Sequence, residues 1–270
     1  MIQIPPARYI LPNLFTLSAT FCGFAAIWLS AQAETGAQFY TAASLIALAV
    51  FLDGFDGRVA RMVHGETKMG VQLDSMSDFL TFGVAPAFLV YHWGLSQLGA
   101  LGLVLCFAFL ACAMLRLARF NVEAEEYSAD DSDGPSRFFT GLPAPMAGMG
   151  LALLVGVNAG LLGRETLPSS GTLGLTIVVL ALAVLMVSEI PFRTFKDMLP
   201  TRRNRLLVAG FLAMLAVVSL SADYMVALAC GLACYFVINA TGGLLSVARV
   251  GASRAGATVE DEDEDDEFLL

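Results

Sequence analysis

Long apolar segments separated by short polar ones decide what this chain can fold into. Its 270 residues are 57% hydrophobic and 14% charged, with a mean hydropathy of +0.72. A helix needs about 20 mostly apolar residues to cross a bilayer. Segments of roughly this kind cover residues 10–31, 39–63, 69–91, 98–120, a run after 141–145 that ends near 162, 172–188, 206–220 and 224–247. We therefore expect an all-α integral membrane protein with about eight transmembrane helices.

The positive charges predict how these helices are oriented. Cytoplasmic loops of membrane proteins carry an excess of Lys and Arg. With eight spans both termini share a side, and that side holds all of the 15 Lys and Arg residues except Arg164. We expect a multi-pass protein of the inner (cytoplasmic) membrane, surrounded by lipid, with both termini cytoplasmic and no nucleic-acid partner.

Two parts of unequal size are expected along the chain. Residues 1–249 carry all the apolar segments and are predicted to form one membrane domain. Residues 250–270 include an unbroken acidic run over 260–267. This run accounts for most of the net charge of the chain, which is -9. Acidic runs of this kind are typical of solvated, disordered tails. We predict a disordered acidic cytoplasmic tail.

Four aspartates stand near the ends of two neighbouring apolar segments. Asp53 and Asp56 close the second segment, and Asp74 and Asp78 open the third. Residues three and four apart share a helix face, and the connection over 62–73 lets the two helices run antiparallel. Unpaired, four facing carboxylates would cost several kcal/mol in a partly dry site. Divalent cations with oxygen ligands remove that cost, so we predict an active site at the cytoplasmic ends of helices 2 and 3.

The residues between these aspartates favour a phosphorylated ligand. Gly57 and Gly70 leave room for close approach, and the guanidinium of Arg61 suits a phosphate. Mg²⁺ keeps coordination positions for phosphates, and two ions could clamp a diphosphate. A charge network that pins two helix ends is the structural alternative. An ion-coupled transporter could also use intramembrane aspartates, but it would place them near the midplane and usually show repeats.

A resemblance to a known family follows from the spacing of eight residues. The sequence matches the motif of the CDP-alcohol phosphatidyltransferases at every fixed position, which are Asp53, Asp56, Gly57, Ala60, Arg61, Gly70, Asp74 and Asp78. Members transfer a phosphatidyl or related group from a CDP-linked donor to an alcohol and release CMP. The resemblance implies that all four aspartates hold divalent metal, two ions of Mg²⁺ or Mn²⁺, and that Asp78 is the base on the acceptor hydroxyl.

The same resemblance implies contacts with the CDP group. It assigns them to Asp53, Gly57, Ala60 and Arg61. The opening segment also fits the family, which makes Asn13 and Thr16 candidate CDP contacts, or else residues that serve the start of the first helix.

Two further stretches resemble the branch of the family that uses L-serine as acceptor. One joins 115–121 to 139–145, and the other covers 185–196. The resemblance implies CDP-diacylglycerol and L-serine as substrates and a homodimer. A carboxylate on the acceptor needs a cation, and the candidate acceptor residues are Arg116, Arg119, Asn121, Arg137 and Lys196. Bases that snorkel to the membrane interface are the alternative reading. Glycerol 3-phosphate or an inositol phosphate stays open as acceptor.

Overall fold

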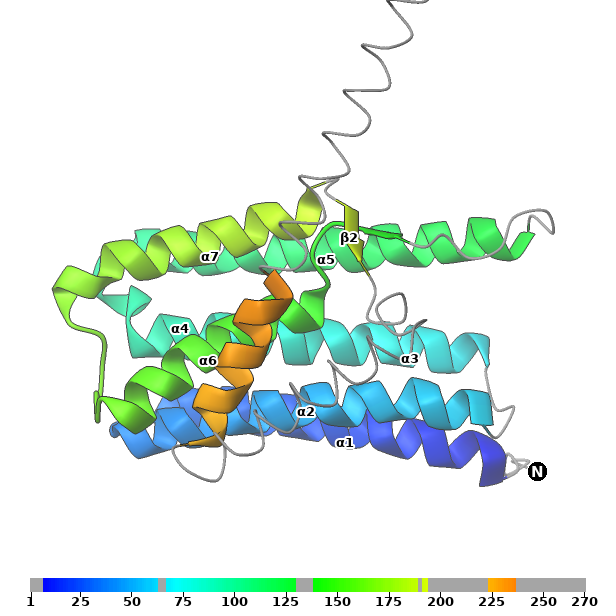
Figure 1. Cartoon of the computed structure of the whole chain (residues 1–270), viewed down its shortest axis with the longest axis horizontal. Helices are drawn as coiled ribbons and strands as arrows, with labels where there is room; N and C mark the ends of the chain where they lie inside the picture. The colour runs from blue at the N-terminus through cyan, green and yellow to red at the C-terminus, as the bar shows by residue number, and fades with distance from the viewer. Residues whose placement is uncertain (1–6, 63–66, 130–137, 189–190, 194–222, 237–270) are drawn as a thin grey trace, which may run out of the picture.

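Each apolar segment within the described chain forms a helix, because a helix satisfies its backbone hydrogen bonds within the segment itself. A computed structural model describes residues 7–62, 67–129, 138–188, 191–193 and 223–236, and nearly all of them are helical (Figure 1). Six helical stretches are long and apolar enough to cross a membrane, and they are Asn13–Gln32, Gly36–Val59, Met69–Trp93, Ala100–Glu123, Ala144–Leu161 and Ser169–Val187. The expected all-α membrane protein is confirmed.

The predicted count of eight spans is not decided by the described residues. The apolar helix Tyr224–Phe236 is shorter than a full span. The rest of the predicted eighth span, 237–247, the seventh span, 206–220, and the acidic tail lie outside the described residues. Eight therefore stays a prediction.

The elements form a helical bundle in which most of the long helices run nearly parallel and one, Ala144–Leu161, lies at an angle to them (Figure 1). Their bounds are α1 Ala7–Gln32, α2 Gly36–Met62, α3 Lys68–Asp78, the π-helix η1 Phe79–Val84, α4 Ala85–Trp93, the 3₁₀ helix η2 Leu95–Leu98, α5 Ala100–Ala129, β1 Phe138–Thr140, α6 Ala144–Leu161, the 3₁₀ helix η3 Ser169–Gly171, α7 Thr172–Val187 and β2 Pro191–Arg193. Helix α1 packs along α2 and also contacts α3, η1 and α4. This arrangement lets α1 support both helices that carry the aspartates.

Two polar stretches between the predicted spans contain regular secondary structure. The acidic stretch that begins at Glu123 continues α5 as far as Ala129. Glu and Ala are good helix formers, and the Arg119 Nε to Glu123 Oε1 ion pair of 3.0 Å supports this helix at i, i+4 spacing. The basic stretch after Pro191 begins with β2, which pairs antiparallel with β1.

A π-helical turn interrupts the rod formed by α3 and α4. The Ala85 N–H donates to the carbonyl of Leu80, five residues back. Pro86 follows, and a proline inside a helix has no N–H and its ring clashes with the carbonyl four residues earlier, here that of Phe82. We attribute the wider turn to this clash. Such turns often accompany functional sites, and this one begins directly after Asp78.

Two glycines let neighbouring helices approach the π-turn. A Cβ on Gly23 of α1 would lie 2.7 Å from Thr81 Oγ1 and 2.9 Å from Thr81 Cα. A Cβ on Gly148 of α6 would lie 2.8 Å from the carbonyl oxygen of Phe82. Small residues allow close backbone contact between membrane helices. The π-turn is therefore clamped between α1 and α6.

We predict that Gly23→Ala destabilises the protein. The added methyl would meet the backbone of Thr81, and overpacking of this kind costs about 1–3 kcal/mol. Thermal unfolding in detergent should show a lower Tm. The matched control is Gly174→Ala in α7, where a Cβ would meet nothing within 4 Å, and its Tm should not fall. Equal behaviour of the two variants would contradict close packing at the π-turn.

Candidate active site

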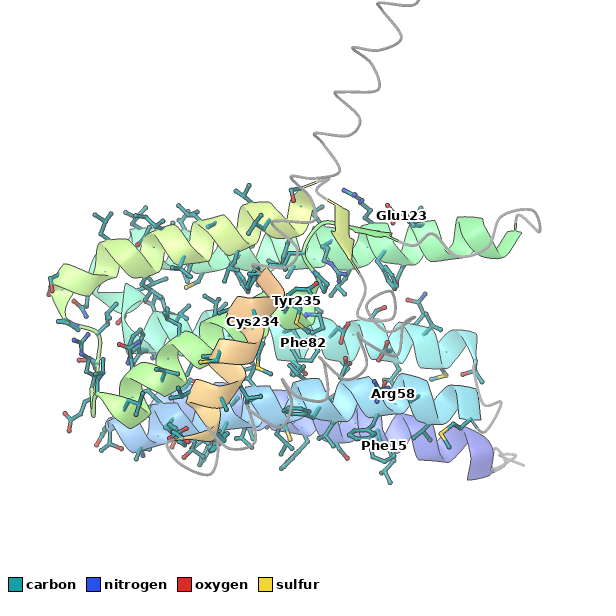
Figure 2. The ribbon with its side chains drawn as sticks, viewed as in Figure 1. Phe15, Arg58, Phe82, Glu123, Cys234 and Tyr235 are labelled. Carbon is teal, nitrogen blue, oxygen red and sulfur yellow. The ribbon has the colours of Figure 1, made fainter. Side chains whose placement is uncertain are left out.

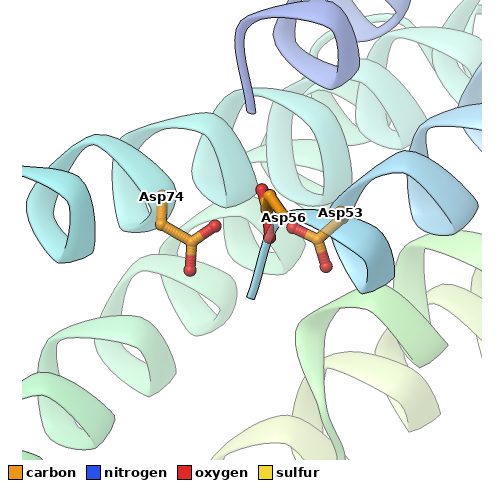
Figure 3. A group of neighbouring side chains, drawn as sticks. All are labelled: Asp53, Asp56 and Asp74. Atoms are coloured by element: carbon orange, nitrogen blue, oxygen red, sulfur yellow. The ribbon is translucent and has the colours of Figure 1, made fainter. Parts of the chain in front are cut away.

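The four aspartates meet in one cluster between α2 and α3. Asp53, Asp56 and Asp74 each bring a carboxylate oxygen within 4.8 Å of the others (Figure 3). The side chain of Asp78 lies close enough to that of Asp53 for their charges to interact. The helical spacing predicts this convergence, since each pair is three or four residues apart.

The cluster lies inside the apolar stretches rather than beyond their ends. Asp56 is three residues before Val59, where the apolar part of α2 ends, and Asp78 is nine residues after Met69, where that of α3 begins. At 1.5 Å per residue these positions are about 5 Å and 14 Å along the helix axes. The carboxylates therefore lie in partly apolar surroundings, with Asp78 set farther along its apolar stretch than Asp56.

The Thr16 hydroxyl of α1 reaches the cluster, and two further hydroxyls join α1 to α3. Asp56 is only 6% exposed, and it accepts hydrogen bonds from the Thr16 hydroxyl at 2.9 Å and from the Gly57 N–H at 2.5 Å. The Thr20 and Ser77 hydroxyls lie 2.7 Å apart, and Ser77 is also 3.2 Å from the carbonyl oxygen of Thr16. These contacts tie α1 to both aspartate helices.

Thr20 and Ser77 are functional candidates that sequence reasoning missed. Thr16 and Thr20 are four residues apart in the first predicted span, a spacing that could have pointed to a polar stripe on α1. Thr16 itself is a candidate CDP contact by resemblance, and the structure directs its hydroxyl at Asp56.

The electrostatics of the cluster fit a divalent cation. Among the described residues none of the four carboxylates is in a salt bridge. The Oδ1 atoms of Asp74 and Asp78 are buried and have no hydrogen-bond partner there. Buried polar atoms in native proteins almost always have a partner, and hard cations take carboxylate oxygens. The residues present therefore could bind a metal ion.

Free space adjoins the cluster at Gly57. A Cβ at this position would meet nothing within 4 Å among the described residues, which leaves room for a ligand next to Asp56. At the start of α3 the Thr67 side chain accepts a hydrogen bond from the Gly70 N–H at 2.9 Å, and Asn13 lies close by, its Oδ1 3.6 Å from where a Gly70 Cβ would stand.

The remaining CDP candidates are only partly described. Ala60 and Arg61 belong to α2, but their side chains lie outside the described residues.

The candidate acceptor residues of α5 have different surroundings. Arg116 is close enough to Asp78 for their charges to interact, and its Nε is buried with no hydrogen-bond partner in the described chain. Arg119 instead pairs with Glu123. Asn121 accepts a hydrogen bond from Ser75 of α3 at 3.0 Å. Of these three, Arg116 is the one whose charge reaches the aspartate cluster.

Two of the acceptor candidates cannot be placed. Arg137 and Lys196 lie outside the described residues.

The β1–β2 pair joins two distant stretches that the family resemblance singled out. Phe139 pairs with Phe192, and the Leu142 N–H donates to the carbonyl of Leu185 at 2.9 Å. Gly141 makes the turn between β1 and Leu142 with a φ of 81°, a value that favours glycine. The connection before α6 is therefore fixed to the end of α7.

Known proteins resemble this chain over most of its length. The profile of the CDP-alcohol phosphatidyltransferase family matches residues 9–188, a segment that contains all four aspartates. CDP-diacylglycerol–serine O-phosphatidyltransferase of Helicobacter pylori is 35% identical over 214 residues, which are 79% of this chain and 84% of that protein.

Two enzymes of the same name from other bacteria show similar likeness. That of Bacillus subtilis is 34% identical over 186 residues, 69% of this chain and 91% of that protein. That of Mycobacterium leprae is 33% identical over 219 residues, 80% of this chain and 69% of that protein. The matched profile, the extent of these likenesses and the aspartate cluster lead to one conclusion: this chain belongs to the CDP-alcohol phosphatidyltransferase family.

Proposed function

We propose that this protein transfers the phosphatidyl group of CDP-diacylglycerol to the hydroxyl of L-serine, giving phosphatidylserine and CMP. The observation that carries the proposal is the cluster of four aspartates set inside apolar helices, where a lipid-anchored diphosphate can reach it. The choice of serine is supported by the printed names of the relatives from H. pylori, B. subtilis and M. leprae.

The aspartate cluster is proposed to hold two divalent ions, Mg²⁺ or Mn²⁺. Asp53, Asp56, Asp74 and Asp78 would supply the ligands, consistent with the two unpartnered Oδ1 atoms. When bound, such ions neutralise a diphosphate and stabilise the departing CMP.

Asp78 is proposed to accept the proton of the serine hydroxyl. The hydroxyl oxygen then forms a bond to the phosphorus that carries diacylglycerol, and the bond from that phosphorus to the oxygen of CMP breaks. A general base must reach the proton that it removes. Asp78 is a suitable group because it is the aspartate whose charge interacts with Arg116, and a guanidinium is the natural partner of the serine carboxylate.

The donor side is proposed to be formed by α1 and α2. The open space beside Gly57 leaves room for the nucleotide, and Asp53, Ala60, Arg61 and Asn13 are the further contacts that we propose. Thr16 would act there through Asp56, to which it donates.

The membrane setting completes the proposal. We propose an inner-membrane homodimer with both termini in the cytoplasm and the aspartate cluster toward that side. The position of Arg164 supports this orientation. A Cβ on Gly36 would lie 2.9 Å from the carbonyl oxygen of Arg164. Gly36 begins α2, and Asp53 and Asp56 lie toward the other end of that helix.

We predict that Asp74→Asn stabilises the metal-free protein and abolishes stabilisation by metal. The change removes one charge from a cluster of like charges, and a gain of about 1 kcal/mol raises Tm by about 2–4 °C in a protein of this size. Wild-type protein should gain about 2.7 kcal/mol when Mn²⁺ is at 100 times its Kd, and the variant should gain little. Thermal unfolding in EDTA and in Mn²⁺ measures both effects.

The matched control for this carboxylate-to-amide change is Glu123→Gln. Glu123 lies near the end of α5 and pairs with Arg119, outside the cluster. This variant should keep the Mn²⁺ response of the wild type. A full Mn²⁺ response in Asp74→Asn would show that the cluster does not hold the metal.

We predict that Asp78→Asn abolishes CMP release while CDP-diacylglycerol still binds. The amide cannot accept the hydroxyl proton, and a loss of about 10²–10⁴-fold is typical for a removed general base. CMP release should be measured with serine, glycerol 3-phosphate and inositol phosphate as competing acceptors. Full turnover of the variant would exclude Asp78 as the base, and release by wild-type protein with glycerol 3-phosphate but not serine would exclude the proposed acceptor.

A further inference from the structure

A hollow of about 270 Å³ lies between α3 and α5, and the first residue of η1 that lines it is Phe79. This volume is close to that of the smaller ligand pockets of proteins, which begin at about 300 Å³. None of the described side chains that line the hollow is charged. It therefore suits a neutral part of a ligand rather than a phosphate or a carboxylate.

The hollow is separate from the aspartate cluster. Gln72 and Met76 line it from α3 and share one face of that helix, since they are four residues apart. Asp74 is two residues from each of them, which is about 200° around the helix axis. The lining residues and this aspartate therefore point to nearly opposite sides of α3.

The polar part of the lining offers hydrogen-bond donors. The Ser75 hydroxyl donates to Oδ1 of Asn121 at 3.0 Å across the two helices. This contact fixes the direction of the Asn121 amide, whose N–H groups have no partner among the described residues. Gln72 adds a second amide without a hydrogen bond in the described chain. Amide N–H groups bind oxygen acceptors such as carbonyl groups.

The lining changes from polar to apolar with depth in the membrane. The apolar parts of the two helices are bounded here by Met69 of α3 and Glu123 of α5 (Figure 2). Asn121 is two residues inside this border and Gln72 three, about 3 Å and 5 Å along the axes. Met114 is nine residues inside, at about 14 Å. The amides thus lie near the polar edge of the hydrocarbon core, and Met114 lies within it.

The deep part of the hollow has an adaptable wall that is open to the outside. Met76 and Met114 are 69% and 55% exposed, whereas Leu117 is buried behind them. Methionine side chains are flexible and adjust to irregular apolar shapes. A lipid chain can therefore enter from the surrounding membrane without crossing the bundle.

We propose that this hollow binds one ester-linked acyl chain of a membrane glycerolipid, apart from the aspartate cluster. The amide N–H groups of Gln72 and Asn121 donate to the ester carbonyl, and the chain lies along Met76, Phe79 and Met114. Donors near the membrane edge and apolar side chains below them match the order of groups in such a lipid. The site goes beyond the proposed function and does not depend on the acceptor alcohol.

The experiment uses the full-length protein in detergent and a phosphatidylglycerol that carries a photoactivatable diazirine on one ester-linked acyl chain. We expect saturable labelling of peptides that contain Met76 or Met114, and competition by unlabelled phosphatidylglycerol. Ala118 is exposed and lines the hollow, so Ala118→Trp should fill it and abolish the saturable labelling. The matched control is Ala181→Trp, at an exposed position of α7 outside the hollow, which should label as wild type.

The donors are tested by a change that keeps the hollow open. Gln72→Leu removes an amide, and loss of one hydrogen bond should raise the half-saturating lipid concentration about 2–10-fold. An ether-linked analogue lacks the carbonyl and should compete less well than the ester with wild-type protein, but about equally with the variant. Gln32→Leu, at an exposed position near the end of α1, is the control and should not change labelling.

Three outcomes would overturn the proposal. One is labelling at these peptides that does not saturate or that persists unchanged in Ala118→Trp. Another is equal competition by ester and ether lipids with wild-type protein. The third is crosslinking of two copies of the chain through this face with exclusion of the probe, which would show that a second copy covers the hollow. None of these results bears on CMP release, so the proposed function is tested separately.

Discussion

Repulsion among four carboxylates inside an apolar bundle is the constraint on which this structure depends. Asp53, Asp56, Asp74 and Asp78 come from two helices that would separate if charge alone decided their distance. Helix α1 opposes that tendency by packing against both and by sending Thr16 to Asp56. The bundle thus holds together a cluster of carboxylates of the kind that hard divalent cations bind.

The fold supports the site from both sides. Ser75 of α3 meets Asn121 of α5 on one side of the aspartate helix, and Thr20 of α1 meets Ser77 on another. Side chains that are fixed in this way keep ligand geometry precise, since second contacts orient the first ones. Asn121, expected from the family resemblance to touch the acceptor, here also joins two helices.

Spacing within one helix was the information that the sequence carried best. The pairing of Asp53 with Asp56 and of Asp74 with Asp78 on one helix face follows directly from their spacing. The spans follow from the length of the apolar segments. Contacts between helices were harder to predict: the partner of Thr16 depends on how α1 crosses α2, and β1 and β2 are three-residue strands about 50 residues apart with no local signal. The predicted fourth span ends at residue 120, whereas α5 continues to Ala129, because Glu and Ala sustain a helix.

The π-turn after Asp78 has a consequence for how this rod can vary. In an α-helix each residue is rotated by about 100° about the axis relative to the one before it. In an uninterrupted helix the direction of the aspartates would therefore determine the direction of the packing residues in α4. The wider turn over Phe79–Val84 inserts an offset between the two halves. The α3 half of the rod can therefore keep its carboxylates directed at α2 while the α4 half acquires a different packing surface. Substitutions that change the packing of α4 need not change the direction of the aspartates.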